Sequence, residues 1–193
     1  MSLQSLILKI DSELELRQLS ERDGTTLFDL TDKNRRYLRQ WLPWLDDTTS
    51  VIDTLQFINA VTNKASGNSG YTFGILHCGV LAGVIAQHQL DRANRAAELG
   101  YWLDEDRQGL GIMTRAAERL VEFAFDNQYC NRVVLRCAAE NLKSRGIPER
   151  LGFVQEGVLR DAEWLYDHFV DLAVYSMLKR DWTDRSRAQS ASS

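Results

Sequence analysis

The chain has 193 residues, which is enough for one well-packed domain and too few for two comfortable ones. Apolar residues make up 44% of it, and the 27 acidic and 23 basic side chains leave a net charge of −4, which argues against a general nucleic-acid binder. No apolar run approaches the roughly 20 residues that span a bilayer and no secretion leader opens the chain, so we expect a cytoplasmic protein without membrane insertion.

The first part of the chain predicts one strand and two helical regions. Residues 14–20 alternate apolar and polar side chains, as a half-buried strand does. Apolar side chains then recur at helical spacing in residues 25–42, a region that Pro43 ends, and again in residues 53–63. Residues 1–12 are treated as an N-terminal segment without a predicted element.

Three apolar runs follow one another in the middle of the chain, at residues 71–76, 80–90 and 97–103. Short turns separate them, and such spacing predicts an antiparallel meander. The first turn contains His77 and Cys78. We interpret this pair as hairpin residues rather than as a nucleophile with its base.

From residue 113 onward the pattern changes to alternating helix and strand. A helix is predicted from Met113 to Ala124, a short buried strand at residues 132–137, and a short helix that ends at Gly152, which is typical of a helix C-terminus. Strands are predicted at residues 153–159 and 168–178, with a loop at 160–167 between them. We therefore expect one α+β domain over residues 13–182, with a central mixed, mostly antiparallel sheet, helices on both faces and a disordered tail at 183–193.

Gly109 and Gly111 stand where the third strand of the meander gives way to the next helix. A P-loop would need a lysine that "QGLGIMT" lacks, and a dinucleotide fingerprint would need a third glycine where Thr114 stands. Two interpretations remain open. Either main-chain N–H groups at the helix N-terminus cradle a diphosphate, or the helix start merely needs flexible residues.

The surroundings of this junction carry a resemblance. Gln108-x-x-Gly111, preceded by "ELGYWLDEDR" and followed by "AENLKSRGIPERLGF", resembles the GNAT superfamily of acetyl-CoA-dependent N-acetyltransferases. Within it, "WLPW", "NLKSRGIPERLGFVQEG" and "LRDAEWLYDHFVDLAVYSML" are similar to the ribosomal-protein serine acetyltransferase group, the RimL/RimJ-like enzymes. The resemblance covers residues 14–178. It departs at Met113, where the superfamily pattern asks for glycine or alanine.

The resemblance implies a site for acetyl-CoA and no metal. The pantetheine arm is expected where the strand at 98–103 splays from the parallel strand at 132–137. The implied cofactor-binding residues are Trp102, Leu103, Asp104, Gln108, Gly109, Leu110, Gly111, Ile112, Met113, Thr114 and Asn141. Asn141 is equally well interpreted as a helix N-cap, and both roles are compatible. The cysteines Cys78, Cys130 and Cys137 are scattered, without metal-ligand spacing, which suits free thiols in a reducing compartment.

Two residues are implied to act in catalysis. Ser144 matches the acid that meets the leaving thiolate, and Glu163 matches a general base acting through water. The alternatives are a solvated helix serine and a loop carboxylate in a surface ion pair. Proximity to Trp164 favours a raised pKa for Glu163, which suits a base.

On the acceptor side we expect Trp41, Trp44 and Arg39 to contact the substrate, although the aromatic pair is equally typical of a core and the arginine of a solvated helix face. The predicted function is acetyl transfer to a primary amine, above all the N-terminal α-amine of a ribosomal protein. The alternatives are a small-molecule acetyltransferase for a polyamine, an aminoacyl nucleotide or an amino-sugar, and a non-catalytic acyl-CoA-binding module. No direct contact with nucleic acid is expected, and a homodimer is compatible with the resemblance.

Overall fold

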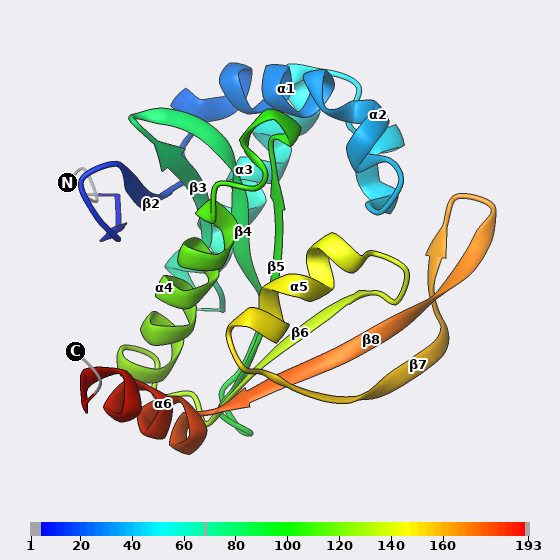
Figure 1. The fold of residues 1–193 in the computed structure, drawn as a ribbon. Coiled ribbons are helices and arrows are strands. Elements are labelled where there is room, and N and C mark those ends of the chain that lie inside the picture. Colours follow the sequence, from blue (N-terminus) through cyan, green and yellow to red (C-terminus); the bar gives the residue numbers. More distant parts are fainter. Residues whose placement is uncertain (1–4, 68, 192–193) are drawn as a thin grey trace.

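The structure, a computed structural model, describes residues 5–67 and 69–191. The helical elements in chain order are η1 (Glu21–Asp23), α1 (Gly24–Lys33), α2 (Arg35–Leu38), η2 (Pro43–Asp47), α3 (Val51–Ser66), η3 (Glu105–Arg107), α4 (Ile112–Asp126), α5 (Leu142–Arg150) and α6 (Lys179–Ala191). The strands are β1 (Ile7–Lys9), β2 (Leu14–Gln18), β3 (Thr72–His77), β4 (Val80–Asp91), β5 (Ala96–Leu103), β6 (Arg132–Ala138), β7 (Val154–Leu165) and β8 (His168–Leu178). Figure 1 shows how they are arranged.

The strands form one eight-stranded sheet in the order β1-β2-β3-β4-β5-β6-β8-β7. Neighbouring strands are antiparallel except β5 and β6, which run parallel and are connected through α4. This confirms the predicted mixed, mostly antiparallel sheet. The parallel pair joins an antiparallel group of five strands, which ends at β5, to an antiparallel group of three strands, which begins at β6 (Figure 1).

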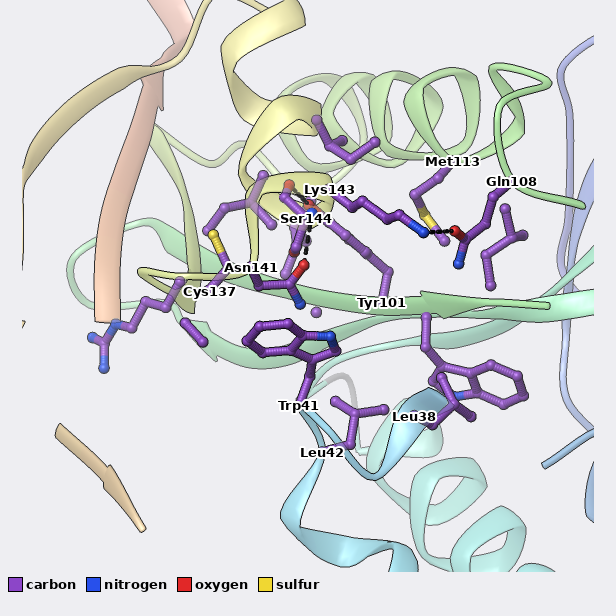
Figure 2. Close-up of a pocket in the computed structure, with 18 of the residues that line it drawn as sticks. Leu38, Trp41, Leu42, Tyr101, Gln108, Met113, Cys137, Asn141, Lys143 and Ser144 are labelled. Atoms are coloured by element: carbon purple, nitrogen blue, oxygen red, sulfur yellow. Dashed lines mark hydrogen bonds between the residues drawn. The ribbon is translucent and has the colours of Figure 1, made fainter. Parts of the chain in front are cut away.

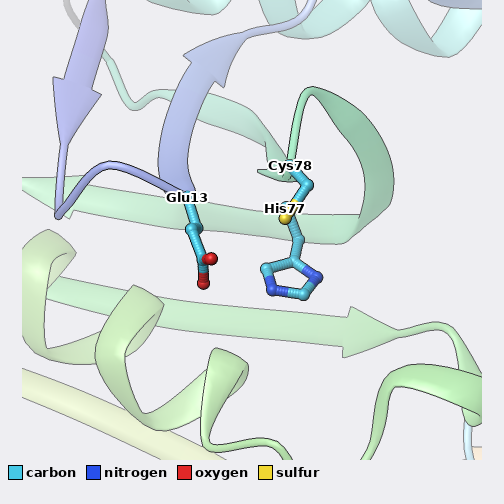
Figure 3. Close-up of side chains that lie close together, drawn as sticks. All are labelled: Glu13, His77 and Cys78. Carbon is cyan, nitrogen blue, oxygen red and sulfur yellow. The ribbon is translucent and has the colours of Figure 1, made fainter.

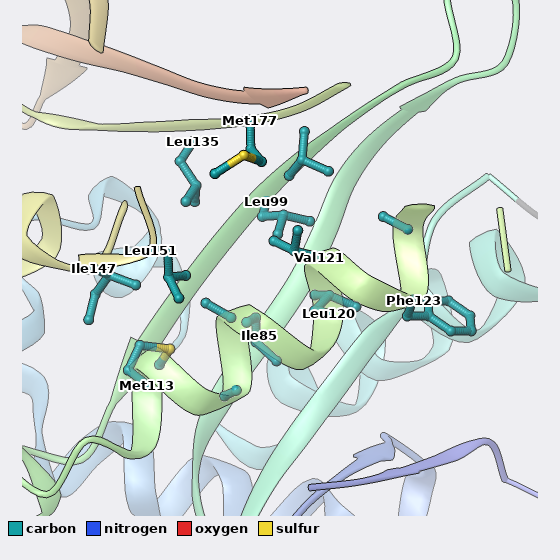
Figure 4. Packing of buried hydrophobic residues seen from close by; sticks show 14 of the residues in the cluster. Ile85, Leu99, Met113, Leu120, Val121, Phe123, Leu135, Ile147, Leu151 and Met177 are labelled. Atoms are coloured by element: carbon teal, nitrogen blue, oxygen red, sulfur yellow. The ribbon is translucent and has the colours of Figure 1, made fainter. Parts of the chain in front are cut away.

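The core lies between the sheet and helices α4 and α5. The apolar stripe of α4 is buried as its spacing predicts, with Ala116, Ala117, Leu120 and Val121 fully inaccessible. Figure 4 shows this stripe against the sheet, with Leu99 of β5 among its neighbours. A second, smaller apolar cluster lies between α1, α3 and the meander. Helices therefore cover both faces, which fixes the position of the strands at the centre.

The structure differs from the sequence prediction at several boundaries. Residues 7–9 form β1, within the segment to which no element was assigned, and residues 1–4 lie outside the described part. The helical region at 25–42 divides into α1 and α2, and Pro43 opens η2 as its first residue, a position that suits the fixed φ of proline. Residues 183–191, predicted as a disordered tail, belong to α6, whose Trp182 packs into the core.

The last hairpin also differs in a way that affects the site. Strand β7 runs on to Leu165 and pairs with β8 up to the Tyr166–Asp167 turn, where a loop was predicted from residue 160. Glu163 therefore lies on a strand, opposite Val170 and next to a register shift between Leu159 and Glu163. A hydrogen-bonded strand holds this carboxylate more firmly than a loop could.

Candidate active site

A cleft opens where β5 and β6 separate. The two strands pair only from Ala96 to Leu99 and from Arg132 to Leu135, and β6 continues on its other side along β8 as far as Leu172. On alternate residues of the rest of β5, such as Leu103, the main-chain groups that point away from β4 are thereby left facing the gap. The resulting cleft has a volume of about 1220 Å³ and is bounded by the segment after α2, β5, the start of α4, β6, α5 and β7.

One end of the cleft is formed by the glycine loop and the first turn of α4. Gly109 and Gly111 have φ of +76° and +71°, in the left-handed region that favours glycine, and a Cβ at either would meet nothing within 4 Å. Within the described part of the chain, the N–H groups of residues 109–114 donate to no protein acceptor, and Gly111 gives α4 no side-chain cap. The loop thus presents a row of free donors at the positive end of a 15-residue helix.

Two cationic side chains of α5 face this loop. Lys143 donates through Nζ to Oε1 of Gln108 at 2.9 Å, and Arg150 donates through Nε to Oγ1 of Thr114 at 3.2 Å. They are seven residues apart, so they lie on one face of the helix. Free N–H groups, open space at the glycines and flanking cations together fit the diphosphate of a coenzyme A molecule. This favours the cradle over a helix start that merely needs flexibility.

The middle of the cleft is organised by the start of α5. Asn141 is its N-cap, accepting at Oδ1 from the N–H of Ser144 at 3.0 Å, and both residues line the cleft. Beside them the thiol of Cys137 is buried, which raises its pKa to about 11. Figure 2 shows Lys143 reaching toward Gln108, with Asn141, Ser144 and Cys137 grouped further along. The cap therefore sets the position of the Ser144 hydroxyl.

The other end of the cleft is formed by Trp41, Leu42, Glu163 and Leu172 with the polar side chains of His88, Glu98 and Arg136. Burial raises the pKa of the Glu163 carboxyl above its ordinary value. In the described part of the chain, Glu163 makes no ion pair, whereas Glu98 pairs with Arg136 at 3.5 Å. Glu163 is therefore a half-buried carboxylate with its acceptor capacity available to the cleft.

The cleft brings most of the predicted site residues together. It is lined by Trp41, Trp102, Leu103, Gln108, Gly109, Gly111, Ile112, Met113, Thr114, Asn141, Ser144 and Glu163. Four predicted residues do not line it, namely Arg39, Trp44, Asp104 and Leu110. Leu110 is exposed, and only its main chain belongs to the loop.

Asp104 has a different environment from the one predicted. Its main-chain N–H donates to the carbonyl of Ala82 at 2.7 Å and its carboxylate accepts from Lys33 and Asn34. Burial acts to raise the pKa of this carboxyl, but these hydrogen bonds outweigh it and the pKa is lowered. Asp104 thus ties β5 to α1 rather than contacting the cleft.

Arg39 and Trp44 also lie outside the cleft. Arg39 donates to Asp46 through Nε and Nη2, both at 2.8 Å, and its guanidinium stacks 3.9 Å from the ring centre of Tyr166. The Tyr166 hydroxyl in turn donates to the carbonyl of Leu42 at 2.6 Å. These contacts hold the tip of the β7–β8 hairpin, which carries Glu163, against the segment after α2. Trp44 is exposed on η2.

Several lining residues were missed by the sequence analysis. Tyr37 of α2 and Tyr101 of β5 face the cleft, and the Tyr101 hydroxyl donates to the main-chain oxygen of Ser144 at 3.0 Å. His88 of β4 lines the same cleft as Glu163. The strand alternation of "VIAQHQL" places His88 on a face but contains no signal that it reaches a cleft built from distant segments.

Outside the cleft, Glu13, His77 and Cys78 lie close together at the β3–β4 hairpin, with one donor atom of each within 4.8 Å of the others (Figure 3). Nδ1 of His77 is occupied by Nη1 of Arg107 at 2.8 Å. That guanidinium places a positive charge beside the three side chains, which disfavours a cation there. We assign this group no ligand.

Comparison with known proteins agrees with this geometry. The family described as the acetyltransferase (GNAT) domain matches residues 13–154. The chain belongs to the GNAT acetyltransferase family. YdaF of Bacillus subtilis is 36% identical over 176 residues, covering 90% of this chain and 96% of YdaF. The ribosomal-protein-serine acetyltransferase of Escherichia coli is 33% identical over 173 residues, covering 89% of this chain and 96% of the relative.

Among solved structures, RimL, a ribosomal L7/L12 alpha-N-protein acetyltransferase in complex with coenzyme A, superposes with a TM-score of 0.88 at 29% identity and covers 92% of this chain and 99% of RimL. The chain is thus an acetyl-CoA-dependent N-acetyltransferase, as the resemblance implied. No helix in the described part of this GNAT acetyltransferase is long and apolar enough to cross a membrane.

Proposed function

We propose that this enzyme acetylates the N-terminal α-amine of a protein, of the ribosomal class that its relatives' names describe. The observation that carries the proposal is the pairing, in one cleft, of a main-chain anion cradle at one end with the ion-pair-free, half-buried Glu163 at the other. The first holds the donor's diphosphate. The second accepts a proton from the acceptor nitrogen.

The site residues divide the work as follows. The N–H groups of residues 109–114, with Lys143 and Arg150, bind the phosphates. The main chain of β5 at Leu103, which points away from β4, aligns the pantetheine arm along the splay, and Trp102 lines the cleft beside it. Because a thioester is already activated, catalysis consists of positioning the amine and moving protons. Ser144 donates a proton to the departing thiolate, and Glu163 takes one from the nitrogen.

The proton chemistry favours an α-amine over a lysine. An α-amino group titrates near 7.7–8.0, whereas a lysine titrates near 10.4. A carboxylate with a modestly raised pKa deprotonates the first far more readily than the second. Asp46, available in principle to attract a polyamine, is engaged by Arg39 instead.

We further propose that the enzyme is a cytoplasmic homodimer. Strand β7 is an edge strand that exposes Val154, Val158 and Leu159, and a second copy would cover such an apolar edge. Sedimentation equilibrium of wild type and of Val158→Glu checks this. We expect a dimer that the substitution weakens, and a wild-type monomer at all concentrations contradicts it.

The acceptor is tested by measuring free-thiol release from acetyl-CoA across a panel of amines. The panel contains Ser- and Ala-initiated peptides, the same peptides with a blocked N-terminus, intact ribosomal proteins, polyamines and aminoacyl nucleotides. We expect turnover of free N-termini only. Exclusive turnover of polyamines or nucleotides would identify a small-molecule acetyltransferase, and coenzyme A binding without any turnover would identify a binding module.

A further inference from the structure

His88 occupies an irregularity in strand β4. Gln87 pairs with Leu99 and Gln89 pairs with Glu98, which are consecutive residues of β5, so His88 is an extra residue without a partner across the ladder. Such a β-bulge changes the direction in which a side chain points and is frequent beside active sites. Here it directs the imidazole into the acceptor end of the cleft.

Gly100 makes room for this ring. A Cβ built on Gly100 would lie 1.8 Å from Nε2 of His88 and 2.4 Å from its Cδ2, distances that no real side chain tolerates. The imidazole therefore lies directly over the main chain of β5 at Gly100. This is the first residue after Leu99, where the pairing of β5 with β6 ends. The bulge on β4 and the glycine on β5 are two separate features of the chain. Together they position Nε2 of His88 over the main chain of β5.

The side chain of His88 is exposed to solvent on the surface of the cleft, yet the surrounding protein favours its uncharged form. Desolvation of the ring lowers the pKa of the imidazole, and Lys64 of α3 has a smaller effect in the same direction. Glu98 of β5 opposes them, but that carboxylate is engaged by Arg136 of β6. Glu163 of β7 lines the same end of the cleft. A neutral imidazole has a free ring nitrogen that can accept a proton.

We propose that His88 is a second proton-accepting catalytic residue, which takes the first proton from the bound ammonium of the acceptor. This rests on the proposed acetyl transfer to an amine. In that reaction R–NH₃⁺ loses two protons as the C–N bond forms and the C–S bond breaks. His88 takes the first and releases it to solvent, which frees the lone pair for attack. Glu163 takes the second from the nitrogen of the intermediate and passes it through water to Ser144, where it replaces the proton that the Ser144 hydroxyl gives to the thiolate.

The test is the pH dependence of kcat/KM for His88→Asn, using whichever amine the wild type turns over. At pH 7 we expect a loss of about 10²-fold, the usual contribution of a positioned base, without a change in KM for acetyl-CoA. The loss should shrink as the pH approaches 9, because an α-amine near pKa 8 then loses its proton unaided. Gly100→Ala, which displaces the ring, should reproduce this profile.

His168→Asn is the matched control, since His168 is exposed at the tip of the β7–β8 hairpin and lies outside the cleft. It should follow the wild type at every pH. A loss for His88→Asn that is the same at pH 7 and pH 9, or no loss, overturns the role of His88 alone. Failure of the wild type to acetylate any amine overturns the proposed function, and the role of His88 with it.

Discussion

The hydroxyl of Tyr101 donates to the main-chain oxygen of Ser144 at 3.0 Å, on the turn of α5 where Pro148 has no N–H to offer that oxygen. In a regular helix the carbonyl of residue 144 would accept from the N–H of residue 148. A proline there leaves the carbonyl without its donor. Tyr101, on β5, supplies one from across the splay and so ties the two walls of the cleft together.

Tyr101→Phe should therefore destabilise the fold by about 1 kcal/mol, the net value of one hydrogen bond, with a further cost if the carbonyl stays unpaired. In the Pro148→Ala background the helix regains its own donor, and the same substitution should cost less. Urea unfolding of the two single variants and the double variant measures this coupling. Equal costs in both backgrounds would show that the tyrosine does not replace the missing N–H.

Two glycines allow the effect of backbone strain to be separated from the effect of a side chain that blocks the approach of coenzyme A. Gly111→Ala and Gly152→Ala each place a Cβ on a residue with φ near +70° and open space, so both should lose about 1–2 kcal/mol of stability. Only Gly111 lies in the cleft. We expect Gly111→Ala to raise the dissociation constant for coenzyme A about tenfold, equivalent to 1.4 kcal/mol, and Gly152→Ala to leave it unchanged.

Isothermal calorimetry with coenzyme A, on variants shown to be folded by circular dichroism, checks this pair. If both variants bind as the wild type does, the phosphates do not approach the main chain at Gly111. If both weaken binding equally, the loss reflects general strain rather than contact.

The features that could be predicted from the sequence are those that depend on short-range patterns of residues. The α4 stripe, the meander and the Asn141 cap follow from apolar spacing and from residue types with strong positional preferences. The sequence did not predict that Asp104 turns away from the cleft, because its partners Lys33 and Asn34 are about 70 residues distant in the chain. The bulge at His88 was missed for the same reason. A bulge is a mismatch between two strands, and neither strand shows it alone.

Glu163 lines the cleft together with other predicted site residues, but it lies on a strand and not on the predicted loop. The aromatic and charged residues of "RDAEWLYD" give no clear alternation, so a loop was predicted where β7 continues. Tertiary contacts, which the local sequence does not show, decide that this segment is a strand. Tyr166, bonded to Leu42 and stacked under Arg39, holds the hairpin tip against the segment after α2.

Glu163→Gln should lower the activity of the enzyme without lowering the stability of the fold. We expect kcat/KM to fall by about 10²-fold or more, as when a general base is removed. Because burial raises the pKa of this carboxyl, its charged form is disfavoured in the fold, and stability is lost as pH rises through the raised pKa. The glutamine variant should therefore be at least as stable as the wild type at pH 8.

The wild-type pH profile gives a second measurement for the same residue. The acidic limb of kcat/KM should lie above the ordinary pKa of 4.5 for a glutamate, since the base must be ionised to act. Thermal unfolding at pH 5 and pH 8 accompanies the kinetics. A glutamine variant that is inactive and much less stable at pH 8 would indicate a structural role instead.

In contrast to Glu163→Gln, Asp104→Asn should lower the stability of the fold substantially and have little effect on coenzyme A binding. The carboxylate is buried, and it accepts from Lys33 at 2.9 Å and from Asn34 at 3.0 Å. Removing its charge should cost roughly 1–3 kcal/mol at pH 7. Since the pKa of Asp104 is lowered in the fold, its contribution is complete above about pH 4 and is lost as pH falls through the lowered value, so the variant and wild type should converge in acid.

Asp106→Asn is the control for this prediction, because Asp106 also pairs with Lys33, at 2.7 Å, but its side chain is 75% exposed. An exposed pair contributes about 0–1 kcal/mol, so this variant should unfold close to the wild type at every pH. Urea unfolding at pH 7 and pH 3, with calorimetric titration of coenzyme A at pH 7, measures both properties. A folded Asp104→Asn protein that no longer binds coenzyme A would contradict this prediction. It would show that Asp104 contributes to coenzyme A binding, as the family resemblance implied, and that its hydrogen bonds to α1 shape the cleft.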